Sequence, residues 1–359
     1  MTRAHITGWG MAVPPTVLGN HDLEQLTETD DEWITSRSGI KERRISHVST
    51  SDLATVAGHR ALAAAGLVPD DVDLLILATC TPDTSIPSAA SYVQAKLGLT
   101  NAAAFDINAA CSGWLYGLEH AQAMIDSGIK RTVLLIGAER LSRHLDFTDR
   151  STAVLFGDGA GATVLQASPT DEAGVMATTT GIDGSAAELL WVPDSGTNTP
   201  PGCMTPGGSG VRMEGREVFR RAVTMMGDSA VKVVEDAGWE LGDVDLLIPH
   251  QANIRIIDAT ARRLGLDPEK VVTNIHAYGN TSAATIPMAL AEALEAGRVR
   301  PGTKIVFAAF GGGLTWAAAA MVWGDRTEPI GTSDAELPGT DQTLDDLLAP
   351  QIEFFGRGR

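Results

Sequence analysis

The sequence predicts an α/β protein made of two similar halves, in which each sheet is covered by helices on both faces. Short, wholly apolar segments alternate with helix-like segments, as is typical of the buried strands of such sheets. The hexapeptide DVDLLI occurs at residues 71–76 and again at 243–248. The chain has 359 residues, of which 44% are hydrophobic, so it is long and apolar enough to form a large core.

The two copies of the hexapeptide are followed by the same predicted elements in the same order. A short strand comes first, then a helix that ends at a glycine, then a buried strand. These elements are 102–110, 112–128 and 132–139 in the first half, and 271–279, 282–297 and 304–313 in the second. We interpret the repeat as a duplication rather than a chance similarity of apolar segments. This alignment puts Cys111 and Asn280 at corresponding points, which predicts that they share one cavity.

The repeat also predicts how the chain divides. Residues 1–170 form an N-terminal half that carries the cysteine, and residues 171–324 form a C-terminal half that carries a histidine and an asparagine of interest. Residues 325–359 are rich in Asp, Glu, Gly, Pro and Thr, a composition typical of a flexible acidic extension. Within them, LDDLLAPQIEFF has the pattern of a short amphipathic segment able to dock on the rest.

Composition and charge exclude several classes of protein. The net charge of −18 and the pI of about 4.8 disfavour a nucleic-acid partner, which needs a basic surface. No apolar run is long enough to span a membrane, and MTRAHITGWG has no signal-peptide core. The cysteines at 80, 111 and 203 form neither a disulfide framework nor a metal-binding pair. We therefore expect a cytoplasmic protein in a reducing compartment.

Cys111 lies in the stretch FDINAACSGWLYGLEHA, just after an apolar run and just before a predicted helix. A helix N-terminus stabilises a thiolate. The small neighbours leave room for an acyl group and let backbone N–H groups approach an oxyanion. The same surroundings suit a cysteine that only fills space in the core. From these residues alone, both interpretations remain open.

Three further stretches place polar or flexible residues at the ends of buried segments. His250, in IPHQANIRIID, follows an apolar strand, where α/β folds often carry function, although a histidine there can be purely structural. Asn280, in HAYGNTSAATIP, precedes a helix start, which suits a turn or an N-cap as well as a site. The glycines of FAAFGGGLTW either offer an N–H to an oxyanion or form a tight turn between strands. LFGDGAGATVL is predicted to be a strand rather than a nucleotide loop, because ATVL is strand-like where that motif needs a helix.

Taken in order, AACSGW, PHQAN, YGNTSAA and FGGGLTW resemble the β-ketoacyl-acyl carrier protein synthase III family, the chain-initiating condensing enzymes with the thiolase fold. The resemblance covers about residues 3–324 and includes DEWITSRSGI and DRSTAVLFGDGAGA. It implies a layered α-β-α-β-α architecture and a homodimer. It also implies an acyltransferase that condenses an acyl-CoA primer with malonyl-acyl carrier protein, with decarboxylation, to start fatty acid synthesis. Acyl-CoA is then a substrate, and neither a cofactor nor a metal is implied.

The resemblance also implies roles for particular residues. The catalytic triad would be Cys111, His250 and Asn280, and the N–H groups of Cys111 and Gly312 would form the oxyanion hole. The residues implied to bind CoA are Trp33, Arg37, Arg150 and Asn253. Those implied to bind the acidic carrier protein are Arg220, Arg255, Arg262 and Arg263. The alternative for these four arginines is a set of solvated helix charges.

The sequence departs from the family pattern in three places. The C-terminal extension has no counterpart in that pattern, and Trp114 replaces the usual phenylalanine. Ile86 stands where some members place a larger phenylalanine that reaches across the dimer and closes the primer pocket. We therefore expect a roomier pocket, lined by Ile86, Leu141 and Phe156, that accepts branched or longer primers as well as acetyl-CoA.

Other functions remain as alternatives at this stage. A related enzyme of secondary metabolism could load a starter unit or transfer an acyl group to oxygen or nitrogen, although an intact Asn280 favours carbon–carbon bond formation. A non-catalytic scaffold that binds a carrier protein would not need the Cys, His and Asn. A thiolase would need a second cysteine in the C-terminal glycine loop, and FGGGLTW has none.

Overall fold

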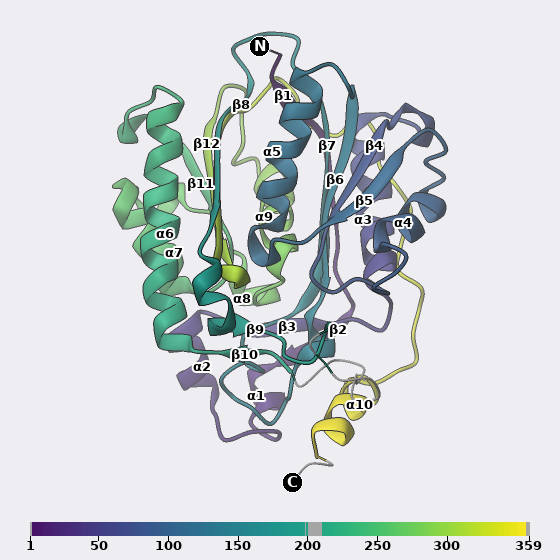
Figure 1. The fold of residues 1–359 in the computed structure, drawn as a ribbon, viewed down its shortest axis with the longest axis vertical. Helices are drawn as coiled ribbons and strands as arrows, with labels where there is room; N and C mark the ends of the chain where they lie inside the picture. The colour runs from purple at the N-terminus through teal and green to yellow at the C-terminus, as the bar shows by residue number, and fades with distance from the viewer. Residues whose placement is uncertain (1, 198, 200–209, 357–359) are drawn as a thin grey trace.

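The structure is a computed structural model that describes residues 2–197, 199 and 210–356. Two mixed sheets stand face to face with a pair of helices between them and further helices on both outer faces (Figure 1). The layers therefore follow the order α-β-α-β-α, and the predicted fold class is confirmed. Among the described helices, none is long and apolar enough to cross a membrane.

The first sheet has five strands in the order β1-β7-β6-β4-β5. These are β1 (Ala4–Ala12), β7 (Asp158–Ala167), β6 (Thr132–Arg140), β4 (Leu74–Ala78) and β5 (Ala103–Ile107). β4 pairs in parallel with β5 and β6, whereas β7 pairs antiparallel with β6 and β1. β7 contains most of the glycine-rich segment that the sequence predicts to be a strand, so that prediction is confirmed.

The second sheet repeats this pattern with four strands in the order β11-β12-β13-β8. These are β11 (Leu246–Pro249), β12 (Lys304–Gly311), β13 (Thr315–Val322) and β8 (Gly174–Ile182). β11 and β12 are parallel, and β13 is antiparallel to both β12 and β8. The strand predicted at 271–279 is wrong, because Val271 makes only an isolated bridge to Leu247 and the chain then turns into α8 (Ile275–Tyr278).

The sheets are covered by three pairs of helices. α3 (Thr50–Ala65) and α4 (Ala89–Leu97) lie outside the first sheet, and α6 (Gly215–Asp236) and α7 (Ile254–Leu264) lie outside the second (Figure 1). α5 (Gly113–Asp126) and α9 (Thr285–Glu295) lie between the sheets. The 3₁₀ turn Ser282–Ala284, which leads into α9, lies very close to β6: a Cβ at Gly137 would sit 2.2 Å from the carbonyl oxygen of Ala283. Only a glycine permits that approach.

The two halves align differently from the sequence prediction. The Asn108 side chain accepts a bond from the N–H of Ala110, and the Asn280 side chain accepts one from the N–H of Ser282. Ala110 and Ser282 both have positive φ, at 48° and 50°, and each precedes a central helix. Asn280 therefore corresponds to Asn108 rather than to Cys111, so the predicted correspondence is wrong. Glycine spacing misled the alignment, because the two helices differ in length.

The smaller elements gather at one end of the molecule, at the bottom of Figure 1. They are β2 (Thr16–Gly19), α1 (Asn20–Leu23), α2 (Asp31–Ser38), β3 (Glu42–Ile45), β9 (Leu190–Trp191) and β10 (Arg212–Met213). β2 pairs with β3, and β9 pairs with β10.

The C-terminal extension is an ordered strap rather than the flexible tail that the sequence predicts. It runs along the outside of α3 and ends in α10 (Leu344–Gly356), which lies next to β2 (Figure 1). The N–H groups of Ile330 and Gly331 donate to the carbonyls of Ala64 and Ala63 in the last turn of α3. The Ala63 carbonyl also accepts from the N–H of Gly66, the C-cap of α3, so the strap adds donors at the C-terminal end of this helix. The docking of LDDLLAPQIEFF is confirmed.

Candidate active site

Cys111 lies where the sequence predicts, in a short 3₁₀ turn (Ala110–Ser112) that leads directly into α5. Its side chain is buried, and the Ser282 and Asn280 side chains hydrogen-bond its thiol. The end of β12 lies against its backbone: a Cβ at Gly311 would sit 2.7 Å from the Cys111 nitrogen. A glycine at this position therefore lets a strand of the second half reach the nucleophile of the first.

The thiol is less acidic than the sequence argument predicts. Burial raises the pKa of Cys111 to about 12, and this effect exceeds the opposing hydrogen bonds from Ser282 and Asn280. The nearby Glu139 carboxylate raises the pKa further. The backbone N–H of Cys111 favours the thiolate, as the sequence predicts, but desolvation of the anion has the larger effect in the unliganded site. Acyl transfer at neutral pH requires a base that accepts the thiol proton.

His250 supplies a neutral imidazole for that purpose. It follows β11 as predicted, and burial lowers the pKa of His250 to about 3. Its Nδ1 lies 2.7 Å from the hydroxyl of Thr285, which lies 3.0 Å from the carbonyl of Ser282. The single hydroxyl proton goes to that carbonyl, so Nδ1 carries the imidazole proton and Nε2 carries a lone pair. Nε2 is buried and has no hydrogen-bond partner among the described residues.

The backbone of Asn280 is hydrogen-bonded to the segment that leads into β7. Its N–H donates to the carbonyl of Leu155, its carbonyl accepts from Gly157, and its side-chain oxygen accepts from Ser282. The amide NH₂ therefore remains as the donor that faces the cavity, near the Cys111 thiol.

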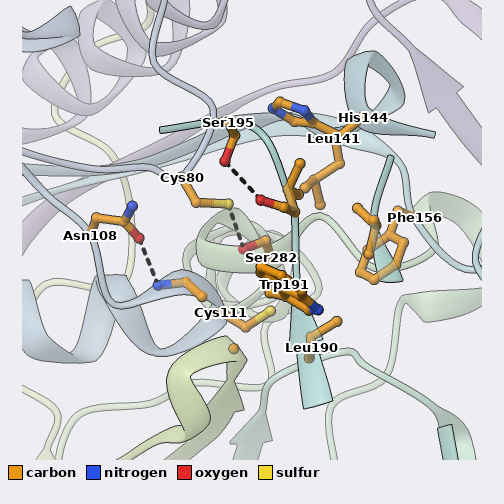
Figure 2. Close-up of a pocket in the computed structure, with 14 residues that line it drawn as sticks. Cys80, Asn108, Cys111, Leu141, His144, Phe156, Leu190, Trp191, Ser195 and Ser282 are labelled. Carbon is orange, nitrogen blue, oxygen red and sulfur yellow. Dashed lines mark hydrogen bonds between the residues drawn. The ribbon is translucent and has the colours of Figure 1, made fainter. Parts of the chain in front are cut away.

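A buried carboxylate beside the nucleophile was not predicted. Glu139, at the end of β6, is fully buried and accepts bonds from the hydroxyls of Thr79 and Thr81 and from the N–H of Cys80. The thiol of Cys80 lies 3.9 Å from the hydroxyl of Ser282 (Figure 2). No periodicity or motif marked Thr285, Glu139 or Ser282, because their importance comes only from contacts between distant segments. Cys203, noted in the sequence, lies outside the described residues.

Two cavities meet at Cys111. The first, of about 260 Å³, is drawn in Figure 2 and extends toward β9, β10 and the segment after β6. The second, of about 90 Å³, runs between the catalytic residues and α6 and α7. Cys111, Phe156 and Leu190 line both. Such an arrangement lets a substrate arrive through one cavity while an acyl group occupies the other.

The first cavity contains two of the three residues predicted to line a primer pocket. Leu141 and Phe156 lie in its wall, together with Leu190, Trp191 and Val211, which the sequence did not single out. Ile86 is not part of this cavity, and its residue surface is 89% exposed. Ile86 is predicted to reach across a dimer into the pocket of a second subunit. A single chain does not test that prediction.

The glycines after β12 form a tight turn between two strands, which is one of the two predictions made for them. The other prediction is that they offer an N–H to an oxyanion. Gly312–Leu314 forms the short turn between β12 and β13. Gly312 also lines the first cavity beside Cys111. The two N–H groups predicted for an oxyanion hole therefore come from residues on the wall of one cavity.

The structure brings three residues of the predicted CoA site together on the surface. The guanidinium groups of Arg37 and Arg150 lie 4.8 Å and 5.1 Å from the ring centroid of Trp33, at cation–π distance. Asn253 is farther along, where it caps α7 by accepting from the N–H of Arg255, and it lines the cavity between Cys111 and α7. The four residues thus extend from the surface to the nucleophile.

The four arginines predicted to bind a carrier protein lie exposed on α6 and α7, two helices packed side by side (Figure 1). Arg220 pairs with Glu217 at 2.6 Å, and Arg263 pairs with Asp228 at 3.0 Å. Hydrogen bonds from Arg220 and from the neighbouring Arg221 lower the pKa of Glu217 to about 2. Exposed pairs contribute little to stability, so an acidic partner can replace the carboxylates.

The five-layered fold and the buried Cys, His and Asn around one cavity define a thiolase-fold condensing enzyme. Family models agree: residues 105–184 match 3-oxoacyl-[acyl-carrier-protein (ACP)] synthase III, and residues 234–323 match the C-terminal part of the same family. The chain belongs to this family of acyl-transferring enzymes.

Similar proteins extend the match to nearly the full length. Beta-ketoacyl-[acyl-carrier-protein] synthase III 2 of Vibrio cholerae is 51% identical over 354 residues, which are 99% of this chain and 98% of the relative. The 3-oxoacyl-[acyl-carrier-protein] synthase III structure from Aquifex aeolicus is 47% identical, with a TM-score of 0.83, over 90% of this chain and 100% of that one. The priming β-ketosynthase of the R1128 polyketide biosynthetic pathway is 34% identical, with a TM-score of 0.85, over 90% of this chain and 97% of that one. The Aquifex enzyme leaves about a tenth of this chain unmatched, as expected if the C-terminal extension departs from the common pattern, whereas the Vibrio relative aligns with the extension.

Proposed function

We propose that the protein condenses an acyl-CoA primer with malonyl-acyl carrier protein, with loss of CO₂, to give 3-oxoacyl-acyl carrier protein and start fatty acid synthesis. The observation that carries this proposal is the meeting of two cavities at Cys111, beside the free Nε2 of His250 and the amide of Asn280. One cavity suits an acyl group and the other suits the pantetheine arm that delivers it.

The first half-reaction uses His250 as a base. Nε2 takes the thiol proton, the sulfur attacks the thioester carbonyl, and the N–H groups of Cys111 and Gly312 hold the oxyanion. The carbon–sulfur bond to CoA then breaks, and the CoA thiolate takes the proton back from Nε2. An acyl thioester on Cys111 and a neutral His250 remain.

The second half-reaction needs hydrogen-bond donors. When the carboxyl–carbon bond of the malonyl group breaks, its electron pair forms an enolate, and the amide of Asn280 donates to the enolate oxygen. His250 also donates in the tautomer that carries its proton on Nε2, which forms between the two half-reactions when water removes the Nδ1 proton and returns one to Nε2, and the Thr285 hydroxyl then turns from the Ser282 carbonyl to donate to Nδ1. The enolate carbon attacks the acyl carbonyl, the carbon–sulfur bond to Cys111 breaks, and the thiolate takes up one proton, which solvent supplies and the overall reaction consumes.

The binding residues follow the same path. Trp33 and Arg150 would hold the adenine of CoA between them, Arg37 would bind its phosphates, and Asn253 would contact the pantetheine arm. Because Arg150 now lies 5.1 Å from the Trp33 centroid, its side chain must move outward to admit a base. The four arginines of α6 and α7 would bind the acidic carrier protein.

We propose that the primers include branched and longer acyl groups as well as acetyl. The cavity beside Cys111 has room for several carbon atoms, since a water-sized group takes about 30 Å³. We also propose a homodimer, supported by the exposed apolar Ile86, and a cytoplasmic location, supported by the free thiols of Cys80 and Cys111.

Intact mass tests the first step. The protein is incubated with acetyl-, isobutyryl- and octanoyl-CoA, with Cys111→Ala as the control. We expect acyl adducts that the variant lacks, and release of each adduct as a 3-oxoacyl product when malonyl-acyl carrier protein is added. A stable adduct that malonyl-acyl carrier protein does not consume would instead favour starter-unit loading, the chemistry suggested by the similarity to a polyketide priming ketosynthase.

A further inference from the structure

The C-terminal helix α10 packs into the apolar cluster that also includes residues of the acyl cavity wall, although it is far from Cys111 in the sequence. Leu347 and Leu348 are buried, and they belong to the same apolar cluster as Leu141 and Phe156, which line the cavity. Thr343 precedes the helix and caps it, because its hydroxyl accepts from the N–H of Asp346. This cap defines where α10 starts and which face it turns inward.

Phe355 of α10 lies beside Gly210, in the segment that enters β10. A Cβ at Gly210 would sit 3.2 Å from the Phe355 ring and 3.5 Å from the carbonyl oxygen of His144. That carbonyl accepts a 2.8 Å hydrogen bond from the N–H of Val211. Val211 and His144 both line the acyl cavity. The ring therefore lies against Gly210, the residue next to the hydrogen bond that joins two parts of the cavity wall.

The strap is what brings α10 to this position. Arg326 donates to the carbonyls of Thr7 and Ala65, and Arg60 donates to the carbonyl of Ala335. These contacts fix the chain between β13 and α10 along the outside of α3 (Figure 1). The Aquifex enzyme is matched over its whole length yet leaves about a tenth of this chain unmatched, which is the share that residues 325–359 make up. The Vibrio relative aligns over the extension.

We infer that α10 is a specificity element for the acyl primer: it holds the Val211–His144 wall in the shape that an acyl chain contacts. This inference rests on the proposed function and assigns the extension a part in it. An acetyl group, held close to Cys111, does not need this wall. A longer acyl chain does, because its outer carbons lie against Val211 and Leu141, and one methylene contact in such a pocket is worth about tenfold in kcat/KM.

The test compares full-length protein with Phe355→Ala and with a chain that ends at Thr343, which keeps the strap. Ala349→Ser, on the exposed side of α10, is the matched control. The measurements are the rates of Cys111 acylation by octanoyl-CoA and acetyl-CoA, and hydrogen exchange at the Val211 amide. We expect both variants to lower the octanoyl-to-acetyl ratio about tenfold and to speed exchange at Val211, with the control unchanged.

The inference is overturned if the octanoyl-to-acetyl ratio of both variants stays within twofold of the full-length value. It is also overturned if every protein loads only acetyl. If the shortened chain does not fold, Phe355→Ala decides alone. If full-length protein forms no acyl adduct at all, the proposed function fails. In that case, hydrogen exchange at Val211 still tests whether α10 holds the wall, and equal exchange in the variants and the full-length protein would rule out that role. The two failures are therefore distinguishable.

Discussion

Replacing Thr285 with valine tests how His250 acts. The change keeps the shape of the side chain but removes the hydroxyl that lies 2.7 Å from Nδ1 of His250. Nδ1 then has a buried N–H without an acceptor, which costs about 1–3 kcal/mol. The imidazole can instead place its proton on Nε2, and it then cannot accept the thiol proton of Cys111. If this cost falls on acylation, the rate drops by about fivefold to about 150-fold.

Stopped-flow or quenched mass measurement of acyl-Cys111 formation provides the assay, with Thr285→Ser as the matched control because serine keeps the hydroxyl. We expect the serine variant to recover most of the rate. We also expect decarboxylation of malonyl-acyl carrier protein to suffer less than acylation in the valine variant, since a proton on Nε2 favours donation to the enolate. Equal acylation rates for the valine variant and the unchanged protein would refute the assignment of the Nε2 lone pair.

Three other predictions follow from the same geometry. The pKa of Cys111 is raised to about 12 and that of His250 is lowered to about 3. A plot of the rate of Cys111 alkylation by iodoacetamide against pH should therefore have no inflection between pH 5 and 9. An inflection near pH 7 would contradict this. Trp33→Ala should raise KM for acyl-CoA about tenfold with little change in kcat. Trp33→Phe is the control, because phenylalanine keeps a face on which the base can stack. An unchanged KM for Trp33→Ala in steady-state kinetics would mean that Trp33 does not touch the base. Gly137→Ala should lower the free energy of unfolding by about 1–3 kcal/mol, because its Cβ would sit 2.2 Å from the Ala283 carbonyl; a melting temperature equal to that of the parent would show that α9 shifts freely.

The pH dependence of stability has a sign that follows from His250. Its pKa is lowered from 6.5 to about 3 in the folded chain, so the unfolded chain binds a proton first as the pH falls. The contribution of neutral His250 to stability is complete above about pH 6.5 and is lost as the pH falls toward 3. Chemical denaturation of His250→Gln and the parent at pH 7 and pH 5 should show a smaller loss of stability in the variant; an equal loss in both proteins would mean that other groups dominate.

Local sequence determined much of this protein. The apolar runs became the buried strands β4, β6, β11 and β12, because hydrophobic burial selects them whatever their neighbours are. Cys111 before α5 and His250 after β11 were identified from their place at the ends of such elements. Those assignments depend on residues close together in the chain, which is why a sequence reveals them.

Tertiary structure decided the rest. The pKa of Cys111 depends on burial, and Thr285 matters only because α9 lies on the first sheet near the end of β11. The register of the two halves follows from the paired positive-φ residues Ala110 and Ser282, and the spacing of the glycines that end the central helices does not reveal it. The extension is ordered because it satisfies carbonyls of α3 and buries Leu347 and Leu348. All of these effects arise from contacts between segments far apart in the chain, and the sequence alone carries no local signal for them.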